Sequence, residues 1–233
     1  MRTLLESPSS ATTPSRVAAL PRVSLALALL AGVVALWGAW VPDLGARLEW
    51  QPAAFAAGEP WRWVSGHLAH FSWEQTWLNI GALLLLGAAV ERLAPRRTAW
   101  VLGLTALAVP AALGPWAPDL PSYRGLSGLA SGAFALLVVL LIRRAVVVGR
   151  RDVALLAVAL GAGFAVKLGW ELTTGRTAFA DGSADGYVVV PLAHAVAAAI
   201  GALVGLAGPA PVSGPGKPQD LHTDRVTGSS KPQ

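Results

Sequence analysis

The stretch GLSGLASGAFALLVVLLI, from Gly125 to Ile142, decides the fold of this 233-residue chain. It contains no charged residue, and a pair of arginines follows it. A helix needs about 20 mostly apolar residues to cross the hydrocarbon core of a bilayer. The stretch therefore predicts a membrane-spanning helix over about 126–143, with the glycine-framed Ser127 at its start.

Five other segments share this apolar character, all rich in Leu, Ala, Val and Gly. They are residues 22–40, 74–92, 98–114, 152–170 and 189–207. Six such segments in succession leave little chain for a soluble surface. We therefore expect an all-α membrane protein with six transmembrane helices. Arginines precede the first segment as in a secretory signal, but no clean cleavage site follows it, so we expect it to be retained.

The composition excludes several classes of site. The chain is 54% hydrophobic and 13% charged, whereas a soluble domain carries about 25% charged residues. It has no cysteine, which rules out a disulfide framework, a thiol nucleophile and thiolate metal ligands. The four histidines show no HExxH spacing, so we expect neither a metal nor another cofactor. The arginines flank apolar segments and form no stripe, so we expect no nucleic-acid partner.

Lysine and arginine predict the orientation. With the N-terminus placed inside, 13 of the 18 basic residues fall on inner segments and 5 on outer ones, and positive charge marks the cytoplasmic side. Nine of the ten tryptophans lie at or near the outer face. We expect a multi-pass protein of the cytoplasmic (inner) cell membrane with both termini cytosolic. Disordered tails, residues 1–19 and 209–233, would flank a membrane domain at 20–208.

This orientation brings polar side chains to one level near the outer face. Ser127 begins the predicted span 126–143, and His194 lies in the first turns of the span 189–207. The segment that leads into the span 74–92, and the outer half of that span, contain His70, Gln75 and Asn79. Polar residues inside a bilayer are costly unless they face one another or a wet cavity. A serine beside a histidine is a nucleophile with its general base. The pattern predicts a catalytic pair that hydrolyses peptide bonds in or beside the membrane.

Small residues would let the helices that carry Ser127 and His194 approach closely. Gly128 and Gly132 are four apart behind Gly125, and the span of His194 has small residues at the same spacing, namely Ala193, Ala197, Gly201 and Gly205. Such faces allow close backbone contact, which a hydrogen bond between the two side chains requires. The alternative is that these residues serve helix packing alone.

Hydrolysis through a tetrahedral intermediate needs hydrogen-bond donors for the oxyanion. Asn79 and Gln75 each carry an amide NH₂ and share a helix face, and His70 and the backbone N–H of Ser127 are further candidates. For Asn79 the alternative is an interhelical hydrogen bond.

Other ionisable residues are expected to be structural. No acid aligns obviously behind His194, which favours a dyad over a triad. Lys167 and Glu171 are four apart and are expected to form an ion pair along their helix. His67 is expected to be a loop imidazole near the interface.

Together these residues resemble the rhomboid family of intramembrane serine proteases over about residues 20–207. The resemblance implies a six-helix bundle with Ser127 as nucleophile and His194 as base, and Asn79 and His70 near the oxyanion site. It also implies membrane-anchored proteins as substrates. Many relatives have histidine in place of Gln75, and glycine in place of Ala197.

Several shorter sequence elements are also similar to those of the rhombosortase branch of this family. The matching elements are Pro60-Trp61-Arg62 leading into Gly66…His70, Tyr123-Arg124-Gly125-Leu126-Ser127-Gly128, Lys167…Trp170-Glu171, and Val190…Ala193-His194. Rhombosortases are thought to process secreted proteins whose C-terminal tail has a Gly-Gly motif, an apolar helix and a basic end. Two alternatives remain: a general rhomboid protease for single-span proteins, and an inactive rhomboid-like binder of transmembrane helices. A small transporter would need symmetric repeats or interrupted helices, and the sequence has neither.

Overall fold

A computed structural model describes residues 21–176 and 190–209, and the regular elements of this part of the chain are helices. Six are apolar and of at least 16 residues, and three short ones lie between the first two of these. The bounds are α1 (Arg22–Gly38), α2 (Leu44–Leu48), α3 (Pro52–Ala56), α4 (Arg62–Ser65), α5 (Trp73–Leu93), α6 (Pro95–Trp116), α7 (Ser127–Val148), α8 (Arg151–Thr174) and α9 (Pro191–Leu206). The predicted tails, residues 1–19 and 209–233, lie outside the described residues except for Pro209.

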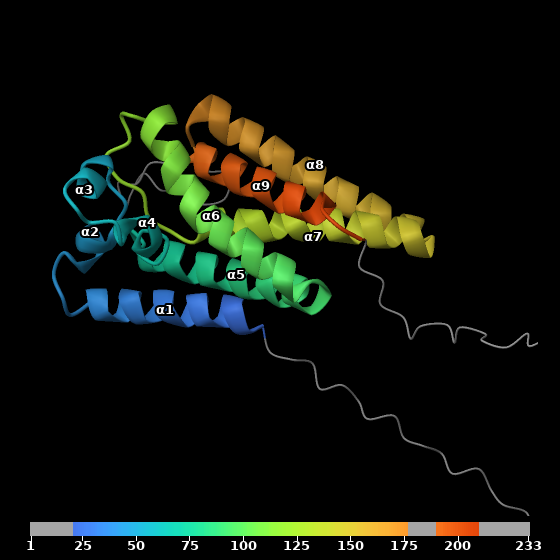
Figure 1. The fold of residues 1–233 in the computed structure, drawn as a ribbon, viewed down its shortest axis with the longest axis horizontal. Coiled ribbons are helices and arrows are strands. Elements are labelled where there is room, and N and C mark those ends of the chain that lie inside the picture. The colour runs from blue at the N-terminus through green and yellow to red at the C-terminus, as the bar shows by residue number, and fades with distance from the viewer. Residues whose placement is uncertain (1–20, 177–189, 210–233) are drawn as a thin grey trace, which may run out of the picture.

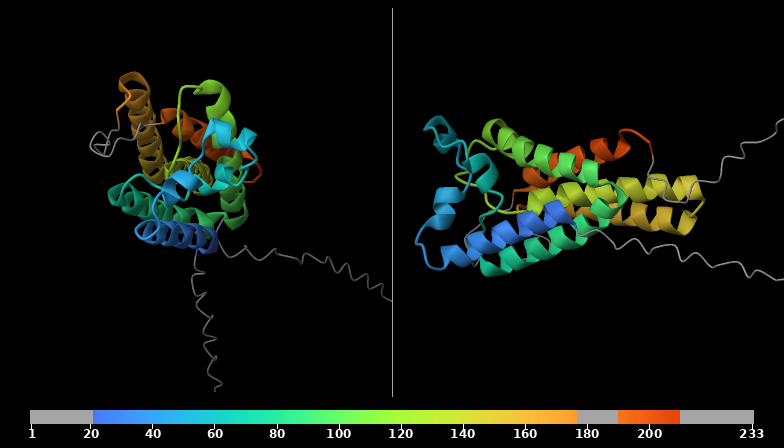
Figure 2. Two further views of the ribbon diagram at one scale, coloured as in Figure 1. Left: turned by 90° about the vertical axis from the view of Figure 1, so that its left-hand side faces the viewer. Right: turned by 60° about the horizontal axis from the view of Figure 1, so that its bottom comes forward.

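The apolar helices form an elongated bundle in which successive helices run in opposite directions (Figure 1). The short helices α2–α4 gather at one end of the bundle, which we call the capped end. α5, α7 and α9 begin there and α8 ends there, whereas α1 begins at the opposite end (Figures 1 and 2). This alternation brings the starts of α5, α7 and α9 and the end of α8 to one end of the bundle.

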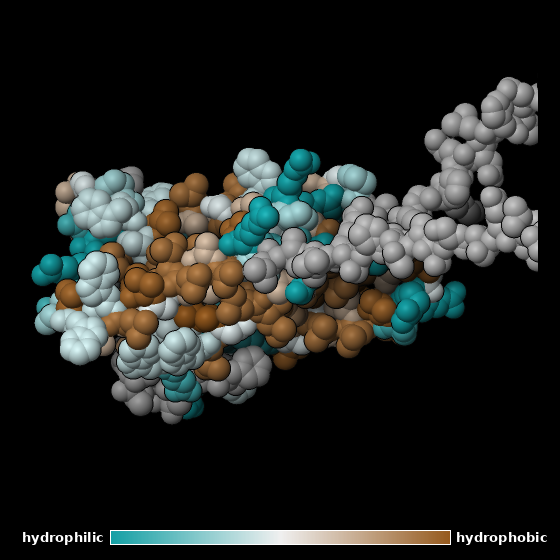
Figure 3. All heavy atoms as spheres, turned by 90° about the horizontal axis from the view of Figure 1, so that it is seen from below, coloured by the Kyte–Doolittle hydropathy of each residue, from teal (hydrophilic) through white to brown (hydrophobic). Residues whose placement is uncertain are grey.

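Four helices, α5 to α8, are long and apolar enough to cross a membrane. The other two apolar helices are shorter, with 17 residues in α1 and 16 in α9. All six predicted segments are therefore helical, but by length and composition the prediction of six spans holds for four of them. One face of the bundle shows a broad hydrophobic surface between more polar ends (Figure 3).

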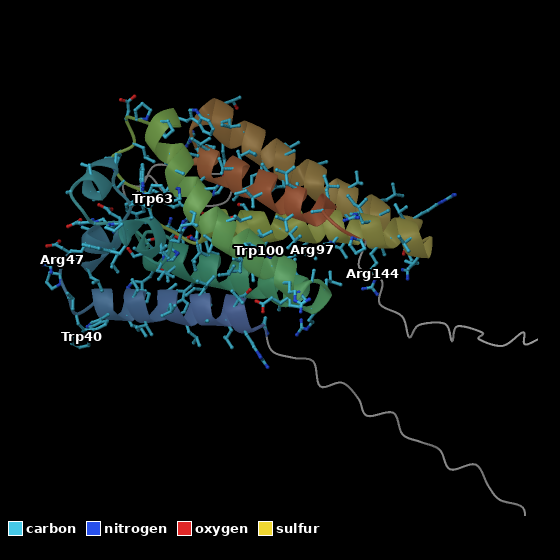
Figure 4. The ribbon with its side chains drawn as sticks, viewed as in Figure 1. Trp40, Arg47, Trp63, Arg97, Trp100 and Arg144 are labelled. Atoms are coloured by element: carbon cyan, nitrogen blue, oxygen red, sulfur yellow. The ribbon has the colours of Figure 1, made fainter. Side chains whose placement is uncertain are left out.

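Tryptophan and arginine are distributed unequally between the two ends. Trp40, Arg47 and Trp63 lie at the capped end, whereas Arg97 and Arg144 lie towards the opposite end (Figure 4). Trp100 lies near Arg97, as expected for the one tryptophan assigned to the inner side.

The central helix is α7, which packs against α5, α6, α8 and α9. Small residues make its contact with α9 close, as predicted. A Cβ added to Gly201 would overlap the carbonyl oxygen of Gly132, and one added to Gly132 would lie 3.2 Å from the carbonyl oxygen of Ala197. Ala197 is itself fully buried, so its methyl group is accommodated within this contact.

The substitution Gly201→Ala is expected to destabilise the bundle. Its methyl group meets backbone, which cannot move without separating α7 from α9, and overpacking of this kind costs about 1–3 kcal/mol. The matched control is Gly163→Ala on α8, where an added Cβ meets nothing within 4 Å. Because glycine inside a helix is less stable than alanine by roughly 0.5–1 kcal/mol, the control should be neutral or stabilising. Thermal unfolding in detergent measures both, and equal stability of the two variants would contradict the packing.

Candidate active site

The loop before Ser127 is fixed by the segment that contains α2–α4. Tyr123 and Trp50 exchange backbone hydrogen bonds at 3.0 and 3.1 Å. The backbone N–H of Gly125 donates to the carbonyl of Gly66 at 3.0 Å. The short helices therefore hold the entrance to α7, and with it the position of Ser127.

Arg124 ties this loop to two parts of the capped end. Its Nε lies 2.6 Å from Oε2 of Glu49, an ion pair in which both side chains are mostly buried. Its guanidinium lies 4.6 Å from the ring centroid of Phe71, within the range of a cation–π contact. It also donates to the carbonyl of His70 at 3.4 Å. Arg124 thus links the loop before Ser127 to the chain that leads into α5.

The predicted oxyanion residues surround Gly125, two residues before Ser127. A Cβ added to Gly125 would lie 3.4 Å from Asn79 Nδ2, 3.4 Å from Gln75 Nε2 and 3.7 Å from His70 Cδ2. Gly125 also has a φ of +120°, which side chains other than glycine rarely adopt. Glycine here lets the loop pass directly beside the two amides. The structure thus brings all three predicted residues to the serine loop.

Gln75 is held by the start of α5. Ser72 is the N-cap residue, and its hydroxyl accepts the Gln75 N–H at 3.2 Å. The Gln75 side chain reaches back, and its Oε1 accepts the Phe71 N–H at 2.8 Å, an arrangement close to a capping box. With Oε1 engaged, the NH₂ group of Gln75 is turned towards Gly125. A structural role in capping and a role as donor are therefore compatible.

Asn79 differs because its amide is uncommitted. Nδ2 is buried and has no hydrogen-bond partner among the described residues. The large majority of buried polar side-chain atoms in proteins do have a partner. The interhelical hydrogen bond that is the alternative for Asn79 is therefore not made by this nitrogen. The NH₂ group is free to donate to an oxygen placed beside Gly125.

His70 lies beside the site, but both its ring nitrogens contact backbone. Nδ1 lies 3.2 Å from the carbonyl oxygen of Leu68, and Nε2 lies 3.4 Å from the Leu126 N–H nitrogen. Burial lowers the pKa of His70 to about 4, so the ring is neutral at neutral pH, with Nδ1 donating and Nε2 accepting. In this arrangement His70 positions Leu126, whereas the sequence suggested a free donor.

Tyr123 and His67 are parts of the site that the sequence did not reveal. The Tyr123 hydroxyl donates to the carbonyl of Gly125 at 3.1 Å. Burial raises the pKa of Tyr123, and its contacts with the Gly128 backbone and the Ser127 side chain offset part of that rise. A phenol hydroxyl therefore lies beside Ser127.

His67 packs against the ring of Tyr123. Its ring packs edge-on against the tyrosine with centroids 5.4 Å apart, and its Nε2 lies 3.1 Å from the carbonyl oxygen of Ala106. The side chain is buried, and burial lowers its pKa to about 4. His67 lies in the turn after α4, as predicted for a loop residue, and this turn carries the imidazole into the protein interior.

The first turns of α7 and α9 meet at the capped end. A Cβ added to Gly128 would lie 3.8 Å from the carbonyl oxygen of Ala193, so the residues next to Ser127 and His194 are neighbours in space. Ser127 and His194 are not hydrogen-bonded to each other within the described part of the chain. Catalytic hydrogen bonds are often long without substrate and tighten in the complex.

An acid does stand behind His194, and the expectation that none aligns is wrong. Nδ1 of His194 lies 3.1 Å from Oε2 of Glu171, and the predicted Lys167–Glu171 ion pair is present at 2.6 Å. The reason is that α8 continues past residue 170 to Thr174, which brings Glu171 to the depth of His194. A carboxylate at that depth, one turn after Lys167, was the available signal.

The described residues contain no group of three or more His, Cys, Asp or Glu side chains that could hold a metal ion. The described site contains a hydroxyl, an imidazole and amide donors. These are the groups that acyl transfer through a serine nucleophile requires.

Comparison with known proteins agrees with this set of functional groups. A family model, the Rhomboid domain, matches residues 57–210. No curated protein matches the chain. Proteins of this family are in general intramembrane serine proteases, although some members are inactive. Because the match covers well over half of the sequence and contains the whole candidate site, the chain belongs to the rhomboid family.

Proposed function

We propose that the protein is an intramembrane serine endopeptidase in which Ser127 is the nucleophile and His194 the general base. One observation carries the proposal: the first turns of α7 and α9 meet, and the loop that leads into α7 passes at Gly125 beside Asn79, whose buried Nδ2 has no partner among the described residues. If the small residues of α7 and α9 served helix packing alone, no unpartnered amide nitrogen would be needed beside the serine loop.

In the proposed mechanism the Ser127 Oγ attacks the scissile carbonyl and its proton passes to Nε2 of His194. The negative oxygen of the tetrahedral intermediate accepts hydrogen bonds from Asn79 Nδ2 and Gln75 Nε2. His194 then donates the proton to the leaving amine, and the peptide bond breaks. Water releases the acyl group from Ser127 by the same proton route. His70 contributes by holding Leu126 and the loop that carries Gly125.

Asn79→Ala is expected to slow turnover by roughly 10²–10³-fold, which is the usual cost of one oxyanion donor. Substrate binding should change little, because the donor acts on charge that develops only in the transition state. Gln75→His restores the residue that many relatives carry and should keep or raise activity. Steady-state kinetics of the reconstituted protein measure both, and a normal rate in Asn79→Ala would assign the amide to packing.

We further propose that all six apolar helices cross the cytoplasmic membrane, with both termini cytosolic and the capped end outside. A reporter fused at the C-terminus should then read as cytosolic, and one inserted after Gly175, between α8 and α9, as exported. The physical reason is the bias of lysine and arginine towards one side. The reverse pattern would contradict the orientation and the outward opening of the site.

The proposed substrates are exported proteins that carry a C-terminal membrane anchor preceded by a Gly-Gly motif, as in rhombosortases. Attack on a peptide bond needs an extended segment, and each glycine lowers helix stability by about 1 kcal/mol relative to alanine. A Gly-Gly pair just outside an apolar helix would let the chain unwind at the level of Ser127.

The test is co-expression with an exported reporter that ends in Gly-Gly, an apolar helix and a basic tail, beside a second reporter with Leu-Leu at that position. We expect processing of the glycine reporter only, and none by Ser127→Ala. Equal processing of both reporters would support the general rhomboid alternative. Processing of neither, by a correctly inserted protein, would support the inactive binder.

A further inference from the structure

Glu171 is a buried charge that the proposed Ser127–His194 dyad does not use. Among the residues of α8, Ala157 and Glu171 are the buried ones, and many of the others are exposed on the outside of the bundle. The Glu171 side chain is only 2% exposed. A carboxylate at membrane depth is costly unless it is paired, so the burial of Glu171 requires partners that repay its desolvation.

The two carboxylate oxygens of Glu171 have different partners. Oε1 accepts from Lys167 Nζ at 2.6 Å, and Oε2 faces His194 Nδ1 at 3.1 Å. An ionised carboxylate only accepts hydrogen bonds, so Nδ1 of a neutral His194 must carry the ring proton. Nε2 is then unprotonated, with its lone pair available. This is the tautomer that a general base needs for the proton of a serine hydroxyl.

Few other charges act on His194 within the described residues. On α7 the ionisable residues, Arg143 and Arg144, lie at its opposite end, and residues 101–116 of α6 contain none. Arg124 in the loop before α7 is paired with Glu49. Tyr123 lies near Ser127 and is neutral, because burial raises its pKa. Within the described residues, Glu171 is therefore the charged group that contacts the His194 ring, and Lys167 contacts Glu171.

We infer that Glu171 is a positioning residue that completes a Ser127–His194–Glu171 relay, and that Lys167 moderates its charge. The inference rests on the proposed function of Ser127 and His194. Glu171 holds the imidazole in the active tautomer and stabilises the imidazolium that forms when the Ser127 proton arrives. Lys167 shares the carboxylate and so weakens its pull on the imidazolium.

The test compares Glu171→Gln with Lys167→Met in the full chain, purified and reconstituted. Glutamine is isosteric and can keep α8 docked, but it has no charge. We expect kcat of Glu171→Gln to fall by about 10²-fold or more with KM little changed, and the acid limb of its pH–rate profile to move to lower pH. Lys167→Met should move that limb to higher pH, because the carboxylate then acts on His194 alone. The control is Glu74→Gln, an exposed carboxylate on the first turn of α5, which should match the parent protein.

A purely structural role, as an ion pair with Lys167 along α8, predicts a different result. Both variants would then break the same pair and lose thermal stability together, with the acid limb unmoved. That outcome would overturn the inference.

A second readout is independent of cleavage. Nitrogen-15 NMR of the His194 ring should show the proton on Nδ1 in the parent protein and a mixture of tautomers in Glu171→Ala. Ser127-dependent cleavage with no response to Glu171 in either readout would overturn the positioning role alone. If the parent protein cleaves nothing although the tautomer depends on Glu171, the proposed function fails and the catalytic use of Glu171 fails with it.

Discussion

Replacing Ser127 with alanine is expected to abolish cleavage of a membrane-anchored reporter while leaving the bundle intact. The hydroxyl is the atom that forms the acyl-enzyme, and loss of a serine nucleophile from a serine–histidine unit costs on the order of 10⁶-fold in kcat. The substitution removes one oxygen from a partly exposed side chain at the start of α7. The measurement is the initial rate of cleavage by purified protein in vesicles, with thermal unfolding of the same sample.

Ser131→Ala is the matched control for this result. Ser131 lies one turn further along α7, and its hydroxyl donates to the carbonyl of Ser127 at 2.8 Å. It is a serine of the same helix with a purely local partner, so its variant should cleave at close to the parental rate. Undiminished cleavage by Ser127→Ala, or equal losses in the two variants, would remove Ser127 from the reaction.

The second large effect is expected for His194→Ala, which should lose activity about as completely as Ser127→Ala. The reason is that a nucleophile without its base cannot be deprotonated as it attacks. The double variant should be little worse than either single one, because residues that act as one unit have non-additive effects. The measurement is a cycle of four rates: parent, each single variant and the double variant.

His67 provides the control for loss of an imidazole. It packs against Tyr123 and the carbonyl of Ala106 and touches no reacting group, so His67→Ala should lower stability and should lower the rate per folded molecule far less than His194→Ala does. Independent, multiplicative losses at Ser127 and His194 would count against a shared step. A fully active His194→Ala would end the assignment of the base.

The helices and most of the site could be predicted from the sequence because they depend on local pattern. Apolar length predicts a membrane helix. The resemblance points to Ser127, His194, Asn79 and His70, and the helix face shared with Asn79 adds Gln75. The structure places all of these residues except His70 on three helices that begin at the capped end. What α1 and α9 lack is length, since helices of 17 and 16 residues do not meet the usual requirement of about 20. Hydropathy alone extended both segments beyond the residues that are helical.

The missed residues depend on contacts between segments far apart in the chain. Glu171 and His194 are 23 residues apart, and the geometry that joins them follows from how far α8 continues before it ends at Gly175, whose φ is +67°. Tyr123 lies beside Ser127 because its backbone pairs with Trp50, a contact without any local pattern. The position of such a side chain along the bundle, and the neighbour that it contacts, follow from helix packing. Composition and periodicity do not reveal that packing.

Covalent labelling of the folded protein measures directly whether Ser127 is an activated nucleophile. The parent protein in vesicles would be treated with a fluorophosphonate probe, which reacts with an activated serine hydroxyl, and the adduct located by mass spectrometry. We expect one adduct on Ser127, absent from Ser127→Ala and strongly reduced in His194→Ala. An adduct on another residue, or equal labelling of the parent and His194→Ala proteins, would contradict it.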